Sequence, residues 1–316
     1  MRIGIDLGGT NIAGGLVDDN CNIIVSKSIP TGRERPAPEI IGDMAGLIID
    51  IVKTAGVSFD DITSIGIGSP GISDRVTGRV IYSNNIRWDN ISLTDEIKHY
   101  IKKDVFLDND ANCAALGEFA AGAAKGYDSA VIITLGTGVG GGIIIDKKLH
   151  HGFNSAANHI GHMSIVSKGE RCTCGRRGCW EAYASVTALI RMAEEAAKAN
   201  PESKLNGILN QHGRLDGRSI FQAVQAGDRA ANDVADQYYY YVADGVTNIA
   251  NILQPDVIVI GGGLSNLGDY LLEPIIDQVK KDVFCKEVPI PVIKIAGLKN
   301  DAGIIGAALL EDYQDL

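Results

Sequence analysis

Short apolar runs that end on glycines open the chain. Ile3 to Leu7 breaks into Gly8-Gly9-Thr10, and Ala13 to Val17 resumes the apolar pattern. A run of this length bounded by turn residues is typical of a buried strand, so the pattern predicts two strands joined by a tight turn. Three more elements are predicted next: a strand over 23–29, a helix over 39–55 and a strand over 62–68. The first part of the chain therefore predicts a mixed α/β domain.

The same design recurs farther along the chain. Ala130 to Leu135 is an apolar run, G-T-G-V-G-G-G follows it, and Ile143 to Ile145 is apolar again. Two such hairpins suggest two related domains facing each other across a cleft, although so short a similarity also fits coincidence. Helices and strands alternate afterwards: helix 233–253, strand 257–260, strand 292–296 and helix 302–311. We expect an α/β fold with domains at 1–120 and 121–300, and a C-terminal helix at 301–316 that packs back on the first.

Composition and charge narrow the class of protein. The 316 residues, 45% of them hydrophobic, exceed what one core usually serves, which agrees with two domains. With 29 basic and 39 acidic side chains the net charge is −10, which disfavours nucleic acid and anionic membranes as partners. The one candidate basic patch, Arg171 with Arg176 and Arg177, is too short to argue for DNA. No signal segment or apolar run of spanning length is evident, so we expect a soluble, cytoplasmic protein.

Metal-ligating residues are concentrated in one short segment. Cys172, Cys174 and Cys179 follow His162, and together they can supply the sulfur and imidazole ligands of a closed, structural Zn²⁺ site. The alternatives are buried free cysteines or a disulfide pair, for which C-x-C is a short loop. The remaining cysteines, Cys21, Cys113 and Cys285, are scattered singly and suggest no function.

The glycine loops suggest a nucleotide site. Backbone N–H groups can approach phosphate oxygens where no side chain blocks them, which favours Gly8, Gly9, Gly136, Gly138 and Gly140 as a phosphate cradle. Thr10 and Thr137 add hydroxyl groups, and Asp6 could hold Mg²⁺ through water. Each loop alone also fits a plain turn, but a third glycine run, 261–263, strengthens the nucleotide interpretation. The P-loop and dinucleotide fingerprints do not occur.

These motifs in this order resemble one family. They are D-L-G-G-T-N at 6–11, G-S-P-G at 68–71, N-I-R-W at 85–88, D-N-D-A-N at 108–112, L-G-T-G-V-G-G-G at 135–142, I-G-H at 160–162 and C-T-C-G-R-R-G-C-W-E at 172–181. The set, spread over almost the whole chain, resembles the ROK family of sugar kinases and repressors. The resemblance implies an actin-like, hexokinase-type fold with a zinc-stabilised loop, ATP and a sugar or polyol as substrates, and a homodimer or homotetramer.

The resemblance also implies residue roles. Asp110 would be the general base that takes the proton from the sugar hydroxyl. The implied substrate-binding positions are Gly71, Asn85, Asn109, Asp110, His159, His162 and Glu181, and the implied nucleotide-binding positions are Asp6, Gly8, Gly9, Thr10, Asn11, Thr137, Gly138, Gly262 and Gly263. His162 would serve both zinc and sugar. Alternatively, Asp108 or Asp110 caps a helix over 111–121, and Glu181 is a first-turn carboxylate of a helix over 181–198.

One position departs from the family pattern. Many members have G-E-x-G-H, whereas this chain has Asn158-His159-Ile160-Gly161-His162. A neutral imidazole offers one donor and one acceptor in place of two acceptor oxygens. The resemblance implies glucose, phosphorylated on its 6-hydroxyl, as the acceptor. A site built for glucose would lose a partner for paired hydroxyl groups at His159, which favours the alternative of another hexose, an amino sugar such as N-acetylmannosamine or a cyclic polyol.

Two other classes of function stay open. The family contains sugar-sensing repressors, but only five residues precede Asp6, which leaves no room for a helix-turn-helix ahead of it. A non-catalytic actin-like ATPase or assembly protein would have no need of the zinc segment together with the sugar-binding set, whereas a non-catalytic ROK-type sugar sensor stays an alternative. An ATP-dependent sugar kinase is the prediction.

Overall fold

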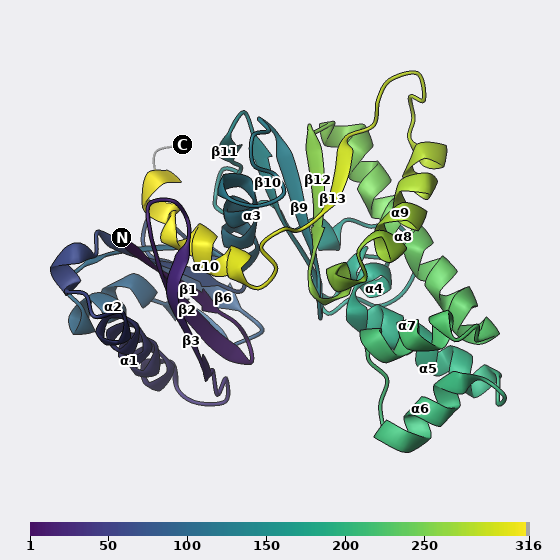
Figure 1. Cartoon of the computed structure of the whole chain (residues 1–316), viewed down its shortest axis with the longest axis horizontal. Coiled ribbons are helices and arrows are strands. Elements are labelled where there is room, and N and C mark those ends of the chain that lie inside the picture. The colour runs from purple at the N-terminus through teal and green to yellow at the C-terminus, as the bar shows by residue number, and fades with distance from the viewer. Residues whose placement is uncertain (314–316) are drawn as a thin grey trace. The chain divides into compact units, whose positions relative to one another are not determined.

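The computed structural model describes residues 1–313, and its chain divides into two compact units (Figure 1). The first contains Met1–Ile132, Gly142–Asn158 and the segment that begins at Gly297; the second contains Ile133–Gly141 and His159–Ala296. The bounds of these units differ from those of the predicted domains, because the division between the units passes through two strands of one sheet. Residues 314–316 of the predicted helix 301–316 lie outside the described residues.

The first unit is built on a five-stranded sheet with the order β3-β2-β1-β4-β8. The strands are β1 (Arg2–Leu7), β2 (Asn11–Val17), β3 (Ile23–Pro30), β4 (Ser64–Ser69) and β8 (Asp104–Asn109). The predicted hairpin is present as the antiparallel pair β1 and β2, whereas β4 is parallel to both β1 and β8. The parallel strands therefore end at the same edge of the sheet.

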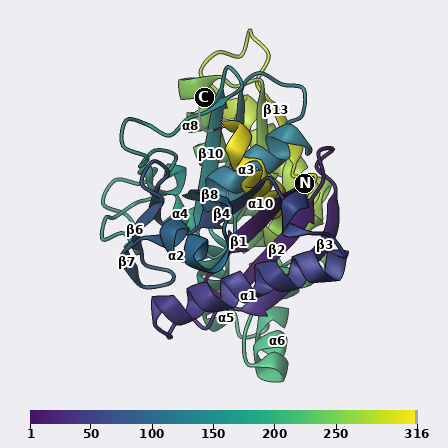
Figure 2. The same ribbon diagram turned by 90° about the vertical axis from the view of Figure 1, so that its left-hand side faces the viewer.

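Alternation along β1 gives the sheet two different faces. Ile3, Ile5 and Leu7 are fully buried in a core shared with α1 (Ala37–Ala55) and α2 (Leu93–Tyr100). Figure 2 shows α1 lying across this side of the strands. Gly4 points the opposite way, where a Cβ would come within 1.9 Å of the Ile304 carbonyl oxygen. This glycine allows α10 (Asp301–Ala308) to pack directly on the sheet backbone.

Smaller elements complete the first unit. The three-stranded sheet β5-β6-β7 consists of Ile72–Asp74, Arg79–Ser83 and Trp88–Ile91. Helix α3 (Asp110–Ala120) follows β8 directly, and the 3₁₀ helices η1 (Phe59–Asp61) and η4 (Leu310–Tyr313) lie before β4 and after α10. The closing helix is thus shorter than predicted, because the chain tightens into η4 after Leu309.

The second five-stranded sheet has the order β11-β10-β9-β12-β13. Its strands are β9 (Ala130–Leu135), β10 (Val139–Ile145), β11 (Lys148–Leu149), β12 (Val257–Gly261) and β13 (Val292–Ile295). The helical elements of the second unit are η2 (Ile160–His162), α4 (Glu181–Ala184), α5 (Val186–Ala199), α6 (Lys204–His212), α7 (Gly217–Gln225), α8 (Arg229–Leu253), η3 (Gly263–Leu267) and α9 (Asp269–Asp282). Among the described residues, no helix is both long and apolar enough to cross a membrane.

Two predicted helices have different bounds for local reasons. The single helix predicted over 181–198 is wrong: Ser185 adopts extended backbone between α4 and α5, and its hydroxyl accepts from the Ala188 N–H to begin the second helix. Helix α8 begins before the predicted Asp233, because the Asp228 carboxylate caps its first turn.

Candidate functional site

The parallel strands of the first unit bring acidic residues to one edge of the sheet. Asp6 lies opposite Gly68 in the register of β1 and β4, and Gly68 lies opposite Asp108 in the register of β4 and β8. Ligands of sheets with parallel strands typically bind beyond the carboxyl ends of those strands. Asp110, the predicted base, comes two residues after Asp108 and begins α3. Residues far apart in sequence are therefore neighbours at this edge.

Asn109 holds the start of α3 in place. Its side-chain oxygen accepts from the backbone N–H groups of Ala111 (2.9 Å) and Asn112 (3.2 Å), which makes it the helix N-cap. Its amide nitrogen donates to the Gly71 carbonyl oxygen at 2.9 Å. The alternative that Asp108 or Asp110 is the cap is therefore wrong, and the Asp110 carboxylate projects from the first helical residue.

Burial changes the acidity of both carboxyl groups. Desolvation raises the pKa of Asp110, although hydrogen bonds led by the one from the Ala111 N–H oppose the shift. Desolvation, followed by the negative charge of Asp110, raises the pKa of Asp6 to about 7. A carboxyl group whose ionised form is disfavoured by burial and by a neighbouring negative charge suits a hard divalent cation such as Mg²⁺, which prefers carboxylate and water oxygens. The residues present thus fit the predicted role of Asp6.

The first glycine loop is fixed at its base and open at its tip. The Gly8 N–H donates to the Asn11 carbonyl oxygen at 2.9 Å, and the Thr31 hydroxyl donates to the Gly8 carbonyl oxygen at 2.7 Å. Thr10 and Asn11 are exposed. A Cβ at Gly9 would lie 3.7 Å from the Asn85 carbonyl oxygen, so the predicted nucleotide loop lies beside a predicted sugar residue, itself exposed. Sequence reasoning missed Thr31, because its partner Gly8 lies 23 residues earlier in the chain.

The second glycine loop belongs to the second unit and is tied to Glu181. The Val139 N–H donates to Oε2 of Glu181 at 3.1 Å, and a Cβ at Gly138 would lie 2.4 Å from the same oxygen. The Thr137 carbonyl oxygen accepts from the Thr187 hydroxyl at 2.8 Å. Glu181 is thus the first residue of α4, as one alternative proposed, and also a support of the loop.

The third glycine run lies against the end of β9. Gly262 has φ +95°, and a Cβ there would come within 2.1 Å of the Leu135 carbonyl oxygen. Only glycine fits this close approach without strain. Gly263 begins η3 directly after it. The structure therefore places the predicted nucleotide residues Gly262 and Gly263 beside the strand that leads into Thr137 and Gly138.

The four predicted metal ligands lie together. One ligand atom from each of His162, Cys172, Cys174 and Cys179 can be chosen so that all four lie within 4.8 Å of one another. Nδ1 of His162 is 3.7 Å from the Cys172 sulfur, and the sulfurs of Cys174 and Cys179 are 3.6 Å apart. A tetrahedral site with Zn–S bonds of about 2.3 Å separates its sulfurs by roughly 3.8 Å, so the residues fit zinc.

The same distances exclude the disulfide alternative, since bonded sulfurs are about 2.05 Å apart and these cysteines are free. The Glu181 carboxylate contacts this group, because Oε1 lies 3.6 Å from the Cys172 sulfur and also accepts from the Thr173 hydroxyl at 3.1 Å. Glu181 therefore connects the Cys/His group with the second glycine loop.

His159 lies just before η2, with its ring centroid 6.3 Å from that of His162. Its side chain is partly exposed, and desolvation, followed by the charge of His162, lowers its pKa. The lowered pKa favours the neutral imidazole, which is the form of His159 that was compared with glutamate in the sequence analysis.

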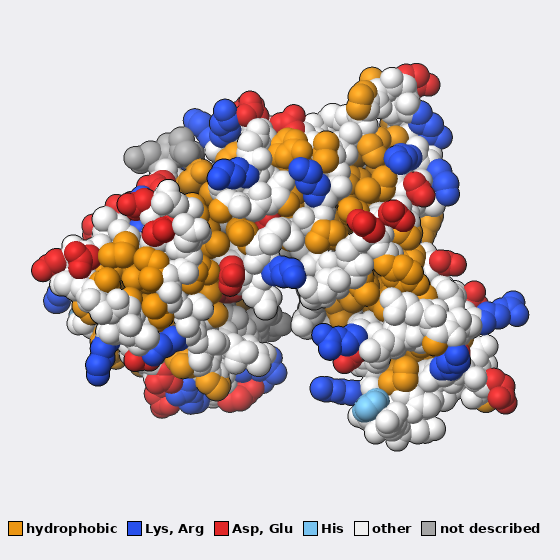
Figure 3. Space-filling view, in the orientation of Figure 1, with side chains coloured by type: hydrophobic (Ala, Val, Ile, Leu, Met, Phe, Trp, Pro, Cys, Tyr) orange, Lys and Arg blue, Asp and Glu red, His pale blue; other side chains and the backbone are white. Residues whose placement is uncertain are grey.

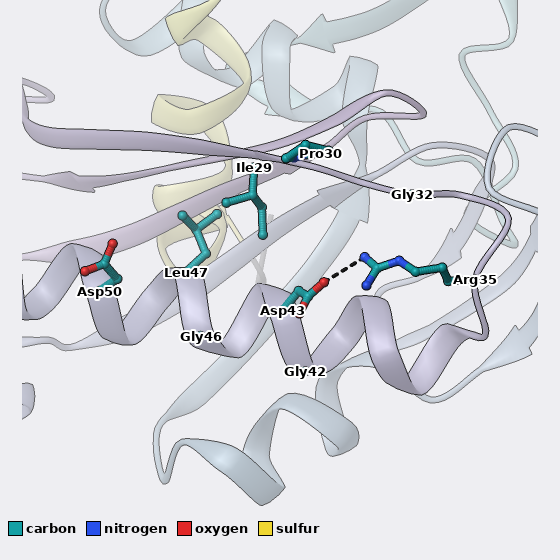
Figure 4. A pocket seen from close by; sticks show the side chains of 9 residues that line it. All are labelled: Ile29, Pro30, Gly32, Arg35, Gly42, Asp43, Gly46, Leu47 and Asp50. Carbon is teal, nitrogen blue, oxygen red and sulfur yellow. Dashed lines mark ion pairs between the residues drawn. The ribbon is translucent and has the colours of Figure 1, made fainter.

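A cavity of about 590 Å³ lies elsewhere, between β3 and α1 (Figure 4). Arg35 and Asp43, which both line this cavity, form an ion pair (Figure 4). Nη2 of Arg35 lies 2.7 Å from Oδ2 of Asp43. The cavity contains none of the predicted site residues. On the face shown in Figure 3, acidic and basic side chains are interspersed.

Comparison with known proteins decides the family. The protein-family model described as "ROK family" matches residues 2–313 of this chain. This chain belongs to the ROK family. The glucokinase of Halalkalibacterium halodurans is 37% identical over 314 residues, which cover 99% of this chain and 95% of that protein. The resemblance found in the sequence motifs is confirmed.

Solved structures of ROK proteins share the fold. A glucokinase from Streptomyces griseus, crystallised with glucose and AMPPNP, has a TM-score of 0.86 and 34% identity, with 98% of each chain covered. A ROK hexokinase from Thermus thermophilus has a TM-score of 0.82 and 30% identity, covering 100% of this ROK chain and 99% of that one. The predicted hexokinase-type α/β fold is confirmed. The xylose repressor of Bacillus subtilis is more distant, at 28% identity over 89% of this chain and 69% of its own.

Proposed function

We propose that this ROK protein is an ATP-dependent sugar kinase that transfers the γ-phosphoryl group to the 6-hydroxyl of glucose. The observation that carries the proposal is the carboxylate of Asp110 at the start of α3, in the same unit as Asp6 and the Gly8-Gly9 loop. Similarity to glucokinases over nearly the whole chain supports the same assignment.

Asp110 is the proposed general base. Its carboxylate accepts the proton of the sugar hydroxyl while that oxygen attacks the γ-phosphorus; the bond to the β,γ-bridging oxygen breaks, and ADP leaves with the electron pair. Burial favours this role, since a raised pKa makes the carboxylate a stronger base. The Asn109 cap fixes the turn that presents it.

The nucleotide would be held mainly by backbone groups. Gly8, Gly9 and Thr10 of the first unit, with Asn11 beside them, and Thr137, Gly138, Gly262 and Gly263 of the second are the proposed phosphate and nucleotide contacts. Mg²⁺, when bound, neutralises phosphate charge, and Asp6 would hold it through water.

Gly71, Asn85, Asn109, His159, His162 and Glu181 are the proposed sugar-binding residues. Nδ1 of His162 faces the Cys172 sulfur, which leaves Nε2 on the opposite side of the ring for another partner. Zinc held by His162 and the three cysteines would fix this ring and the segment that leads to Glu181. Its proposed role is positional.

Substitution of Asp110 tests the proposal. Asp110→Asn keeps the shape of the side chain but removes its basicity, so we expect kcat for glucose phosphorylation to fall about 100- to 10,000-fold. A coupled colorimetric assay of ADP release measures kcat. Wild type and a reaction without sugar are the controls. Unchanged turnover in a folded variant would remove Asp110 from the role, and wild-type protein that phosphorylates no sugar would refute the kinase assignment.

His159 supports a second candidate, a kinase of another hexose, an amino sugar or a cyclic polyol. Glutamate in its place would restore two acceptor oxygens for paired hydroxyl groups. We expect His159→Glu to raise kcat/KM for glucose roughly tenfold or more relative to the other acceptors, since a hydrogen bond to a charged group contributes about 1.5–3 kcal/mol. A panel of glucose, mannose, N-acetylmannosamine and inositol measures the ranking, and an unchanged ranking would end the hypothesis.

Assembly as a homodimer or homotetramer and a cytoplasmic location stay predictions.

A further inference from the structure

Polar side chains behind the first turn of α3 form a connected hydrogen-bond network. Oδ2 of Asp108 lies 2.7 Å from Nε2 of His151, and the two side chains are only 5% and 9% exposed. Oδ1 of Asp108 accepts from the Asn109 backbone N–H at 2.6 Å and from Nδ2 of Asn112 at 2.8 Å. Oδ1 of Asn112 accepts from Nδ2 of Asn158 at 2.8 Å. None of these contacts has a part in the chemistry described above.

The network holds the segment 151–158 at both ends. His151 contacts Asp108 and Asn158 contacts Asn112, one helical turn farther along the chain. Asn158 also donates to the His150 carbonyl oxygen at 2.5 Å and has φ +69°, a conformation that asparagine tolerates better than most residues. Between the two anchors, Phe153 is fully exposed. The segment is therefore held at both ends, by Asp108 and Asn112, and exposes Phe153 between them.

Removing His151 would disturb the residue next to the proposed base. A buried carboxylate is costly unless its oxygens are bonded, and His151 is the partner of Oδ2. Without it, Asp108 would shift toward water and loosen its bond to the Asn109 N–H. Asn109 caps α3 and is followed directly by Asp110, so the displacement reaches the base.

We propose that His151 is a positioning residue of the acceptor site, which holds the Asn109-Asp110 turn in place through Asp108. The inference rests on the proposed kinase function. His151 itself needs no contact with the sugar. Rates of group transfer depend steeply on placement, and a shift of about 1 Å can cost roughly 100-fold.

A matched series of variants tests the inference in the full-length protein. The side-chain amide of glutamine reaches about as far as Nε2 of histidine, whereas that of asparagine is shorter. We expect His151→Asn and His151→Ala to lower kcat/KM for the sugar about 10- to 100-fold, with KM for MgATP nearly unchanged. His151→Gln should retain most of the activity. His150→Ala changes an exposed neighbour in the same segment and should match wild type.

Hydrogen exchange supplies a readout that does not need activity. The backbone amides of residues 109–112 should exchange faster in His151→Asn than in wild type, and His151→Gln should restore their protection. Equal activity in wild type and His151→Asn, or equal loss in His151→Gln and His151→Asn, would overturn the inference. An inactive wild type would refute the proposed kinase function instead, and the exchange rates alone would then decide whether His151 positions the turn.

Discussion

At the scale of residues, the most unusual group is Asp6. Its carboxyl group has a pKa of about 7, well above the ordinary value of 3.8, because it is desolvated and close to the charge of Asp110. The folded protein therefore keeps a proton on Asp6 at a pH at which the unfolded chain has lost it. Between about pH 4 and pH 7, the stability contributed by Asp6 falls as the pH rises.

Asp6→Asn should remove this dependence. We expect the stability of the variant relative to wild type to grow by about 2–3 kcal/mol from pH 5 to pH 8 in the ligand-free protein, since asparagine has no proton to lose. Thermal unfolding at several pH values measures the difference. Asp60→Asn, at an exposed position, is the control and should follow wild type. Parallel profiles for Asp6→Asn and wild type would contradict the raised pKa.

At the scale of elements, the segment 162–181 has little regular structure of its own. It contains isolated bridges between Ser164 and Cys179 and between Arg171 and Arg177 rather than a ladder. Its end is anchored by Trp180, which is fully buried and donates from its ring N–H to the Tyr241 carbonyl oxygen at 2.7 Å. With a metal bound, the Cys/His group can add to these contacts and hold the segment in one conformation.

Zinc removal should therefore weaken this element. We expect purified protein to contain about one zinc per chain, and a strong chelator to lower both Tm and sugar kinase activity, with recovery when zinc is added back. Cys174→Ser should lose the metal and behave like the chelated protein. Cys285→Ser, which changes a cysteine outside the group, should keep both properties. Wild type that is active and equally stable without metal would rule out the positional role.

At the scale of the whole molecule, the two five-stranded sheets share one strand order. In each sheet, the two strands of the hairpin are neighbours (β1 and β2, β9 and β10), and the next strand in the chain (β3 or β11) lies beside the second of them. Two later strands lie on the other side, next to the first strand of the hairpin. The two later strands run parallel to each other in both sheets, as β4 with β8 and β12 with β13. The short sequence similarity between the hairpins therefore belongs to a repeated topology, as the recurrence of the glycine loops suggested.

The amino-acid sequence by itself determined the two hairpins and the chemical groups. Apolar runs ending on glycines located both hairpins, and the spacing of Cys172, Cys174 and Cys179 after His162 predicted the ligand group that the structure brings together. These features depend on residues close together in the chain, where strand and helix periodicity and short loops fix what can meet. The motifs gave the family because each motif is a short pattern of residues that are close together in the chain.

Only the tertiary structure decided which distant groups are neighbours. The register of β1, β4 and β8 places Asp6 and Asp108 at one edge, and His151 meets Asp108 across 43 residues of sequence. The choice of Asn109 as the cap, with its amide on Gly71, likewise depends on a contact between separate elements. Such contacts follow from which strands pair and how helices pack on them, and local sequence patterns leave that pairing open.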